Sequence, residues 1–210
     1  MKTYTGVSRY HLREIEITKS VFITELFPVH SAEEAEERLL EVKTKYKDAT
    51  HNCYAYIVGE SGIQMRMSDD GEPQGTAGAP MLEVLKKRGV SDTLAVVTRY
   101  FGGVKLGANG LVGAYSRCVA EALTEIGTVT YTPTVFAKLS LDYTYYGKLL
   151  GKLEQLEVEI TDKDFSGAVC LDCAVKESRW QEFLETVASL TAGEGKVSET
   201  DRRHYVFQNL

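Results

Sequence analysis

Residues 68–115 read SDDGEPQGTAGAPMLEVLKKRGVSDTLAVVTRYFGGVKLGANGLVGAY, and the first half of the chain is organised around this stretch. Glycine-rich loops occupy 69–78 and 102–110, and seven of the 18 glycines in the chain lie in them. An amphipathic segment and then an apolar, β-branched run separate the loops, and a further helical pattern follows Asn109. The stretch therefore predicts loop, helix, strand, loop and helix, with glycine where the backbone needs a positive φ or a close approach.

Both loops carry charge beside their glycines. Asp69, Asp70 and Glu72 lie in the first loop and Lys105 lies in the second. We expect the two loops to form one polar surface. The alternative is that both are ordinary connectors between a helix and a strand.

The composition indicates a soluble protein of one or two domains. The chain has 210 residues, of which 43% are hydrophobic and 26% charged, and its net charge is −6. That charge argues against coating of nucleic acid by bulk attraction, although a local basic patch is compatible with it. The apolar runs fall short of the roughly 18 residues that a membrane span needs. No signal peptide is visible in residues 1–20. Because the chain has only four cysteines, we expect a cytoplasmic protein.

Four cysteines are too few for a disulfide framework in a chain of this length. Cys170 and Cys173 have CxxC spacing but fall in an alternating segment typical of a strand, where residues three apart point to opposite faces. Because a second CxxC is missing, we interpret both as structural cysteines.

Periodicity and turn residues outline the first half. Ser31 and Glu34 predict a capping box at the start of a helix. Gly89 and Gly127 are typical helix ends. The predicted elements are two strands within 10–27 turning near Lys19, a helix from Ser31, strands at 52–59 and 63–67 around a turn at 59–62, a helix from Gly75 or Thr76 through Lys86, a central strand at 94–101, and a helix at 111–126.

The composition changes near 129–134, and we place a domain boundary there, between domains at 1–132 and 135–210. Ser178 and Gln181 predict a second capping box. The second domain reads as strand 135–143, helix 145–156, strand 157–163, strand 168–176, helix 179–191 and strand 196–207. This βαββαβ order matches a ferredoxin-like sandwich, so the predicted fold class is α+β.

Anion binding is the strongest chemical hypothesis for the second loop. The loop leads into a helix, whose N-terminus offers unpaired N–H groups and a positive dipole end. The ligand would be phosphate, from a nucleotide or from an RNA backbone. Alternatively, Lys105 is a solvated loop lysine and Asn109 is a helix cap. The predicted phosphate- or RNA-binding residues are Arg99, Gly102, Gly103, Lys105, Gly107, Asn109, Gly110 and Arg117.

The first loop offers a polar site made of Asp69, Asp70, Glu72 and Thr76. Its carboxylates suit magnesium or calcium, but the spacing is not that of an EF-hand. The alternative is structural: an Asx-turn, or pairing of Asp70 or Glu72 with Lys105 or Arg99. Any bound metal stays undefined at this level, and we expect no cofactor.

Nucleophilic catalysis has little support, and no catalytic residue is assigned. His51 and Cys53 would share one face of a strand, which allows a Cys–His pair. Neither residue lies in a recognisable nucleophile motif. A core cysteine beside a surface histidine is the commoner arrangement.

Three stretches, SDDGEPQGTAGAP, VVTRYFGGVKLGANGLVGAYS and HNCYAY at 51–56, resemble the signature of the IMPACT family. The resemblance covers nearly the whole chain and is to the bacterial, YigZ-like members. One mild departure is Asn109, which stands where glycine is frequent in that loop. The resemblance implies a fold like domain 2 of ribosomal protein S5 for the first half and a ferredoxin-like second half. Eukaryotic members regulate translation through a different accessory domain, which this chain lacks.

The resemblance implies contact with RNA or the ribosome by analogy of fold. The first hypothesis is therefore a non-enzymatic, translation-associated regulatory protein that binds RNA or the ribosome through its glycine-rich loops. A protein partner is a further hypothesis, in which Tyr54, Tyr56, Tyr100 and Phe101 supply aromatic contacts. The alternative function is a phosphate- or nucleotide-binding enzyme with the loop at 102–110 on phosphate and magnesium at 69–72. We expect no contact with a membrane.

Overall fold

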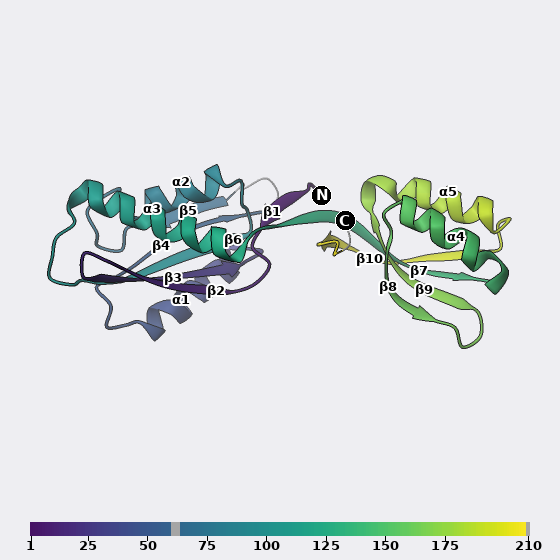
Figure 1. Cartoon of the computed structure of the whole chain (residues 1–210), viewed down its shortest axis with the longest axis horizontal. Coiled ribbons are helices and arrows are strands. Elements are labelled where there is room, and N and C mark those ends of the chain that lie inside the picture. Colours follow the sequence, from purple (N-terminus) through teal and green to yellow (C-terminus); the bar gives the residue numbers. More distant parts are fainter. Residues whose placement is uncertain (60–63, 209–210) are drawn as a thin grey trace. The chain divides into compact units, whose positions relative to one another are not determined.

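The computed structural model describes residues 1–59 and 64–208, which divide into two compact units (Figure 1). One unit spans Tyr4–Thr130, and the other contains Met1–Thr3 together with the chain from Tyr131 onward. Each unit has its own sheet and its own helices. This arrangement confirms the predicted α+β class. The grouping of Met1–Thr3 with the C-terminal unit differs from the predicted range of the first domain.

The N-terminal unit is built on a five-stranded antiparallel sheet with the order β2-β3-β6-β4-β5. Its central strand is β6, as the long apolar run predicts. A short strand, β1 (Tyr4–Gly6), bridges Val90 through Thr5. The sheet strands are β2 (His11–Ile17), β3 (Ser20–Pro28), β4 (His51–Val58), β5 (Gln64–Ser68) and β6 (Thr93–Tyr100). The predicted turn at 59–62 lies largely outside the described residues.

Helices cover both faces of this sheet (Figure 1). Helices α2 (Gly78–Lys87) and α3 (Gly107–Ile126) pack on one face, and α1 (Ala32–Lys45) packs on the other. Alternate residues of β4 enter the two cores, so both of its faces are buried. This burial explains why residues 53–58 of the strand are continuously apolar or aromatic.

The predicted helix caps are partly correct. At α1, Ser31 accepts a hydrogen bond from the N–H of Glu34, but the Glu34 carboxylate accepts from the N–H of His30 rather than of Ser31. Helix α3 begins at Gly107, earlier than predicted. Its first turn consists of small residues without an apolar pattern, so the periodicity does not reveal it. It ends as predicted, at Gly127 with φ 74°.

The second sheet has five strands: β10, β7, β9 and β8 are antiparallel neighbours in that order, and β1 also pairs with β7. Residues 129–134, where the sequence places the domain boundary, belong to the continuous strand β7, and the division between the units falls inside it. The elements are β7 (Val129–Leu141), α4 (Tyr143–Gln155), β8 (Glu159–Asp164), β9 (Val169–Lys176), the 3-10 turn η1 (Glu177–Arg179), α5 (Trp180–Leu190) and β10 (Lys196–Tyr205).

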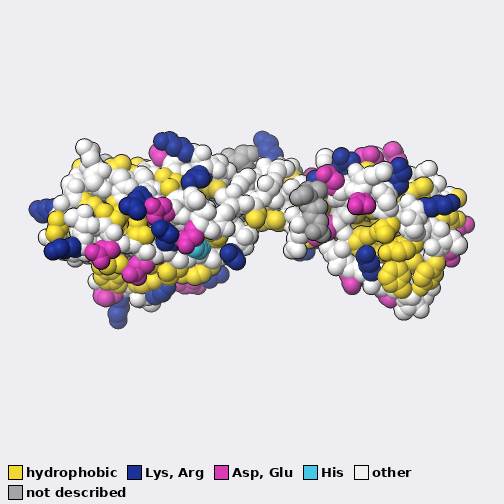
Figure 2. Space-filling view, viewed as in Figure 1, with side chains coloured by type: hydrophobic (Ala, Val, Ile, Leu, Met, Phe, Trp, Pro, Cys, Tyr) yellow, Lys and Arg dark blue, Asp and Glu magenta, His cyan; other side chains and the backbone are white. Residues whose placement is uncertain are grey.

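The capping box predicted for the last helix is absent from the described structure. Ser178 lies inside η1, and Arg179, at the N-cap of α5, makes no side-chain cap bond. Cys170 is exposed and Cys173 is buried, so the predicted opposite orientation is confirmed, and all four cysteines are free thiols. No helix among the described residues is both long and apolar enough to cross a membrane. Charges of both signs are interspersed over the face shown in Figure 2.

Candidate functional site

Asp69 organises the first glycine-rich loop from inside. Its carboxylate accepts hydrogen bonds from the backbone N–H groups of Gly75 at 2.8 Å, Ala77 at 3.0 Å and Gly78 at 2.8 Å. Burial raises the pKa of Asp69, but these three donors outweigh it and leave the pKa below its ordinary value. The carboxylate therefore holds the start of α2, whose own N-cap residue, Ala77, has no side chain that can accept a hydrogen bond.

Asp70 is also engaged within the protein. Its backbone has a positive φ of 44°, and its carboxylate accepts from Lys43 Nζ at 2.9 Å and from the N–H of Asn52 at 2.7 Å. Burial raises the pKa of Asp70, but Lys43 and the Asn52 N–H lower it to a net value below the ordinary one. This contact ties the loop to α1 and β4.

Glu72 and Arg99 form a buried ion pair between the first loop and the central strand. Glu72 Oε1 accepts from Arg99 Nη1 at 2.6 Å and from the Tyr115 hydroxyl at 2.8 Å. The two residues are only 8% and 5% exposed. The predicted internal pairing of first-loop acid with Arg99 is therefore present. Removing one partner of such a pair costs about 3–5 kcal/mol, because the other charge stays buried.

His51 and Cys53 lie beside this pair but do not form a nucleophilic dyad. The ring Nδ1 of His51 is 2.8 Å from the carbonyl oxygen of Asp70. The thiol of Cys53 donates to the carbonyl of Asp69 at 2.9 Å, and its residue is fully buried. Burial raises the pKa of Cys53 to about 12, so the thiol stays protonated near neutral pH.

These contacts correct the expectation of one polar surface. The carboxylates of Asp69, Asp70 and Glu72 bind groups of the chain itself, and Thr76 is buried with its hydroxyl donating to Pro73 at 2.6 Å. Within the described residues, no group of three or more histidine, cysteine, aspartate or glutamate side chains is placed to hold a metal ion.

The second loop packs against the β2–β3 turn at its first residue, Gly102, and is exposed to solvent after it. A Cβ at Gly102 would lie 1.8 Å from the carbonyl oxygen of Lys19, so only glycine fits there. Phe101 before it and Lys105 after it are exposed. Helix α3 then begins at Gly107, with Leu106 at the N-cap. Because Leu106 cannot accept a hydrogen bond through its side chain, the first N–H groups of α3 receive no help from the cap.

Asn109 is therefore not the helix cap that the alternative interpretation places there. It lies in the first turn of α3 and is exposed. Its neighbour Gly110 packs against Leu106, where a Cβ would come within 3.0 Å of the leucine Cβ. Small residues let this first turn and the preceding loop approach each other closely.

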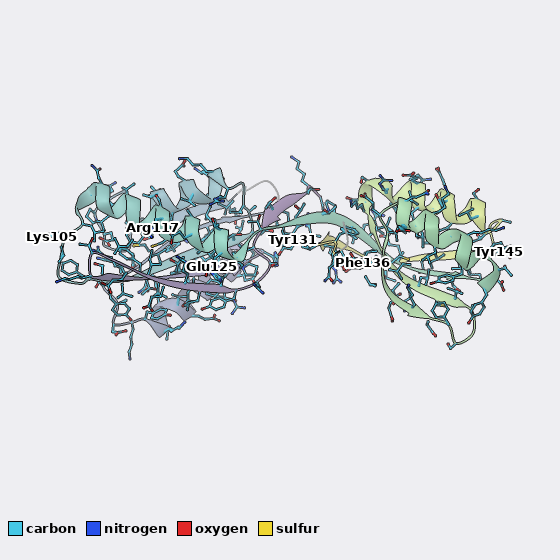
Figure 3. All side chains as sticks on the ribbon, in the orientation of Figure 1. Lys105, Arg117, Glu125, Tyr131, Phe136 and Tyr145 are labelled. Carbon is cyan, nitrogen blue, oxygen red and sulfur yellow. The ribbon has the colours of Figure 1, made fainter. Side chains whose placement is uncertain are left out.

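A pocket of about 410 Å³ lies between the second loop, α3 and the turn that joins β2 to β3. Lys105 lies in the loop just before α3, and Arg117 lies within that helix (Figure 3). Arg117 Nε also donates to Glu121 at 2.7 Å, which leaves part of its guanidinium available. The lining residues are Ile17, Thr18, Lys105, Leu106, Gly110, Gly113, Ala114 and Arg117.

The residues predicted for the second site therefore do not all lie at one surface. Lys105, Gly110 and Arg117 line the pocket, whereas Arg99 is an internal partner of Glu72. Sequence reasoning missed Thr18 and Lys19, which both have positive φ values in the β2–β3 turn. The predicted turn near Lys19 was the available signal, but its contact with Gly102 depends on the pairing of β3 with β6.

The aromatic residues proposed for a protein contact are also separated. Tyr54 and Tyr56 are only 6% and 3% exposed and belong to the core under α1. Tyr100 is half-buried and donates to Asp48 at 3.1 Å. Phe101 is 46% exposed. Of these four rings, Phe101 is therefore the one with a large accessible surface.

Comparison with known proteins gives a consistent assignment. The model of the Impact N-terminal domain matches residues 18–123, and that of a domain of unknown function, DUF1949, matches residues 139–194. The IMPACT family member YvyE of Bacillus subtilis is 42% identical over 199 residues, covering 95% of this chain and 92% of that protein. The IMPACT family member YigZ of Escherichia coli is 37% identical over 180 residues, covering 85% and 88%.

A solved structure agrees with these matches. The crystal structure of a hypothetical protein has a TM-score of 0.63 and 34% sequence identity, and the match covers 96% of this chain and 98% of that one. Both the sequence matches and this structure extend over the two units. The chain belongs to the IMPACT family.

Proposed function

We propose that this chain is a non-enzymatic regulatory protein of translation that acts in the cytoplasm by binding RNA or the ribosome. The observation that carries the proposal is the pocket beside the second loop. It combines the ammonium group of Lys105, the guanidinium of Arg117, the Thr18 hydroxyl and the uncapped start of α3. Each of these groups donates hydrogen bonds or positive charge to phosphate oxygens.

We also propose the finer fold assignments that the family resemblance implies. The order β10-β7-β9-β8, with α4 and α5 packed on one face of the sheet, supports a ferredoxin-like C-terminal unit. For the N-terminal unit the proposal is a fold like domain 2 of ribosomal protein S5. Fold likeness alone does not define a function, so the binding site rests on the pocket.

The test is sedimentation of the purified protein with ribosomes and subunits over a salt series. We expect saturable co-sedimentation that weakens with salt, because contact with phosphate releases counterions. Lys105→Ala should weaken binding and make it less steeply dependent on salt. Lys87→Ala removes an exposed lysine from the other end of the α2–α3 layer and should leave binding unchanged. Absence of co-sedimentation at low salt would contradict the proposal.

The alternative of a magnesium-dependent nucleotide-binding enzyme has less support. The oxygens that would bind magnesium already accept hydrogen bonds from backbone N–H groups, Lys43, Arg99 and Tyr115. Binding of magnesium would have to break these internal contacts. A calorimetric titration with magnesium nucleotides should therefore give no heat, and a saturable signal would favour this alternative.

A further inference from the structure

We infer that Phe101 is a stacking platform for an unpaired RNA base, so that the RNA held beside the second loop is single-stranded. The inference rests on the proposed function and specifies its ligand. Single-stranded nucleic acid is bound where aromatic side chains for the bases lie beside cations for the backbone. Both features meet at the β2–β3 turn.

The first observation is the exposure of Phe101 at the end of the central strand. The apolar residues of β6 are fully buried, whereas Phe101, immediately after it, is 46% exposed. Its N–H donates to Thr50 Oγ1 at 3.1 Å, which fixes the backbone that carries the ring. An aromatic ring that is held in place and half open to solvent offers a face for stacking.

The second observation is the charge that supports this ring. The guanidinium carbon of Arg99 lies 5.5 Å from the centroid of Phe101 and 5.4 Å from that of Phe22. Arg99 is itself fixed by Glu72 and by the Ser20 hydroxyl, at 2.6 Å and 3.2 Å. The ring therefore rests against an immobile cation, and little ordering is needed when a base arrives.

The third observation connects the ring with the pocket. Gly102, next to Phe101, packs against the carbonyl of Lys19, and the preceding residue, Thr18, lines the pocket together with Lys105 and Arg117. The exposed side chain of Lys19 adds a further cation to the turn between them. A base on Phe101 and a phosphate in the pocket would therefore belong to neighbouring nucleotides of one strand. A duplex hides the faces of its bases and would use only the cations.

The experiment measures fluorescence anisotropy of a labelled oligouridine of about 12 nucleotides and of an RNA duplex of equal length. Phe101→Ala should weaken binding of the oligouridine about tenfold, within the range that loss of one base-stacking ring costs. It should leave duplex binding unchanged. Phe101→Tyr should retain wild-type affinity, because its ring still stacks. Lys105→Ala should weaken the binding of both the oligouridine and the duplex.

Leu40→Ala is the matched control, because Leu40 is 66% exposed on α1, on the opposite face of the sheet. Each variant is first shown to melt like the wild type, so that loss of binding is not loss of fold. If Phe101→Ala weakened the binding of oligouridine and duplex equally, or of neither, the stacking inference would be overturned. Weaker binding by Lys105→Ala in the same experiment would still support the proposed function. Absence of binding by the wild type to both RNAs and to ribosomes would overturn both.

Discussion

At the scale of single residues, glycine has a different purpose at different positions of the two loops. Gly71 and Gly75 have positive φ values of 88° and 77°, which other residues adopt with strain. Gly102 is required for space, since its missing Cβ leaves room for the Lys19 carbonyl. The density of glycine in the sequence indicated the loops, but only the packing of the loop on the β2–β3 turn distinguishes these reasons.

Gly102→Ala tests the steric reason. Because a Cβ would lie 1.8 Å from a backbone oxygen, either the loop or the turn must move. We expect a loss of about 1–3 kcal/mol in the free energy of unfolding, typical of overpacking, measured by urea denaturation. Gly113→Ala is the control, since its Cβ would meet no atom within 4 Å in the middle of α3. It should stabilise the protein by up to about 1 kcal/mol through helix propensity. Equal effects would contradict the steric argument.

The charged residues show how far the sequence predicts a site. Pairing of Arg99 with Glu72 was foreseen as an alternative, because the first loop carries acidic residues and the strand before the second loop carries Arg99. Lys43 was not foreseen as the partner of Asp70, since it lies on α1 and meets the loop only after the sheet has formed. The residue types thus predicted which charged groups could bind a ligand. The fold decided which of these groups pair inside the protein and which stay accessible to solvent.

At the scale of elements, helix starts were predicted less well than strands. The strands β2 to β6 follow alternating or continuous apolar patterns, and their predicted positions agree closely with the structure, whereas the short strand β1 was not predicted. The N-cap residue of α2 makes no side-chain hydrogen bond, and Asp69, from the preceding loop, accepts the hydrogen bonds of the first N–H groups instead. The start of α3 carries glycine, alanine and asparagine, so neither periodicity nor a capping residue marks it. A cap supplied from a distance is invisible to a local pattern.

Asp69→Asn tests this distant cap. The amide keeps one acceptor oxygen but loses the charge that faces three N–H donors at the start of α2. We expect a loss of about 1–2 kcal/mol in the free energy of unfolding at neutral pH, as for a helix N-cap. Because folding lowers the pKa of Asp69, its contribution is present above the unfolded pKa and is lost as the pH falls through the folded one.

Chemical denaturation of both proteins between neutral and acidic pH measures this difference. The difference in stability between wild type and Asp69→Asn should begin to shrink below pH about 4 and should vanish only below the lowered pKa of Asp69 in the folded protein. Glu83→Gln is the matched control, because Glu83 forms an ion pair with Lys86 on the exposed surface of α2. It should change the stability by less than about 1 kcal/mol. A difference for Asp69→Asn that persists unchanged into acid would show that the charge is not responsible.

At the scale of the whole molecule, the chain has separate hydrophobic cores in its two units. Met81 is fully buried in the core between the first sheet and α2 and α3. Leu171 is 1% exposed in the core between the second sheet and α4 and α5. The change in composition near 129–134 indicated two domains, but it did not indicate that β7 is continuous there. The strand ladder with β9 and β10 begins before the alternating pattern does.

Separate cores predict separate responses to cavities. Met81→Ala and Leu171→Ala each remove a buried side chain and should each cost about 2–5 kcal/mol within their own unit. Hydrogen exchange followed by mass spectrometry resolves where that loss occurs. Met81→Ala should accelerate exchange in peptides from 4–130, and Leu171→Ala in peptides from 131–208, each leaving the other set unchanged. The continuous strand β7 is the element through which coupling would pass, so its peptides are the most informative. If either substitution accelerated exchange equally in both sets, the two cores would unfold as one cooperative unit despite their separate packing.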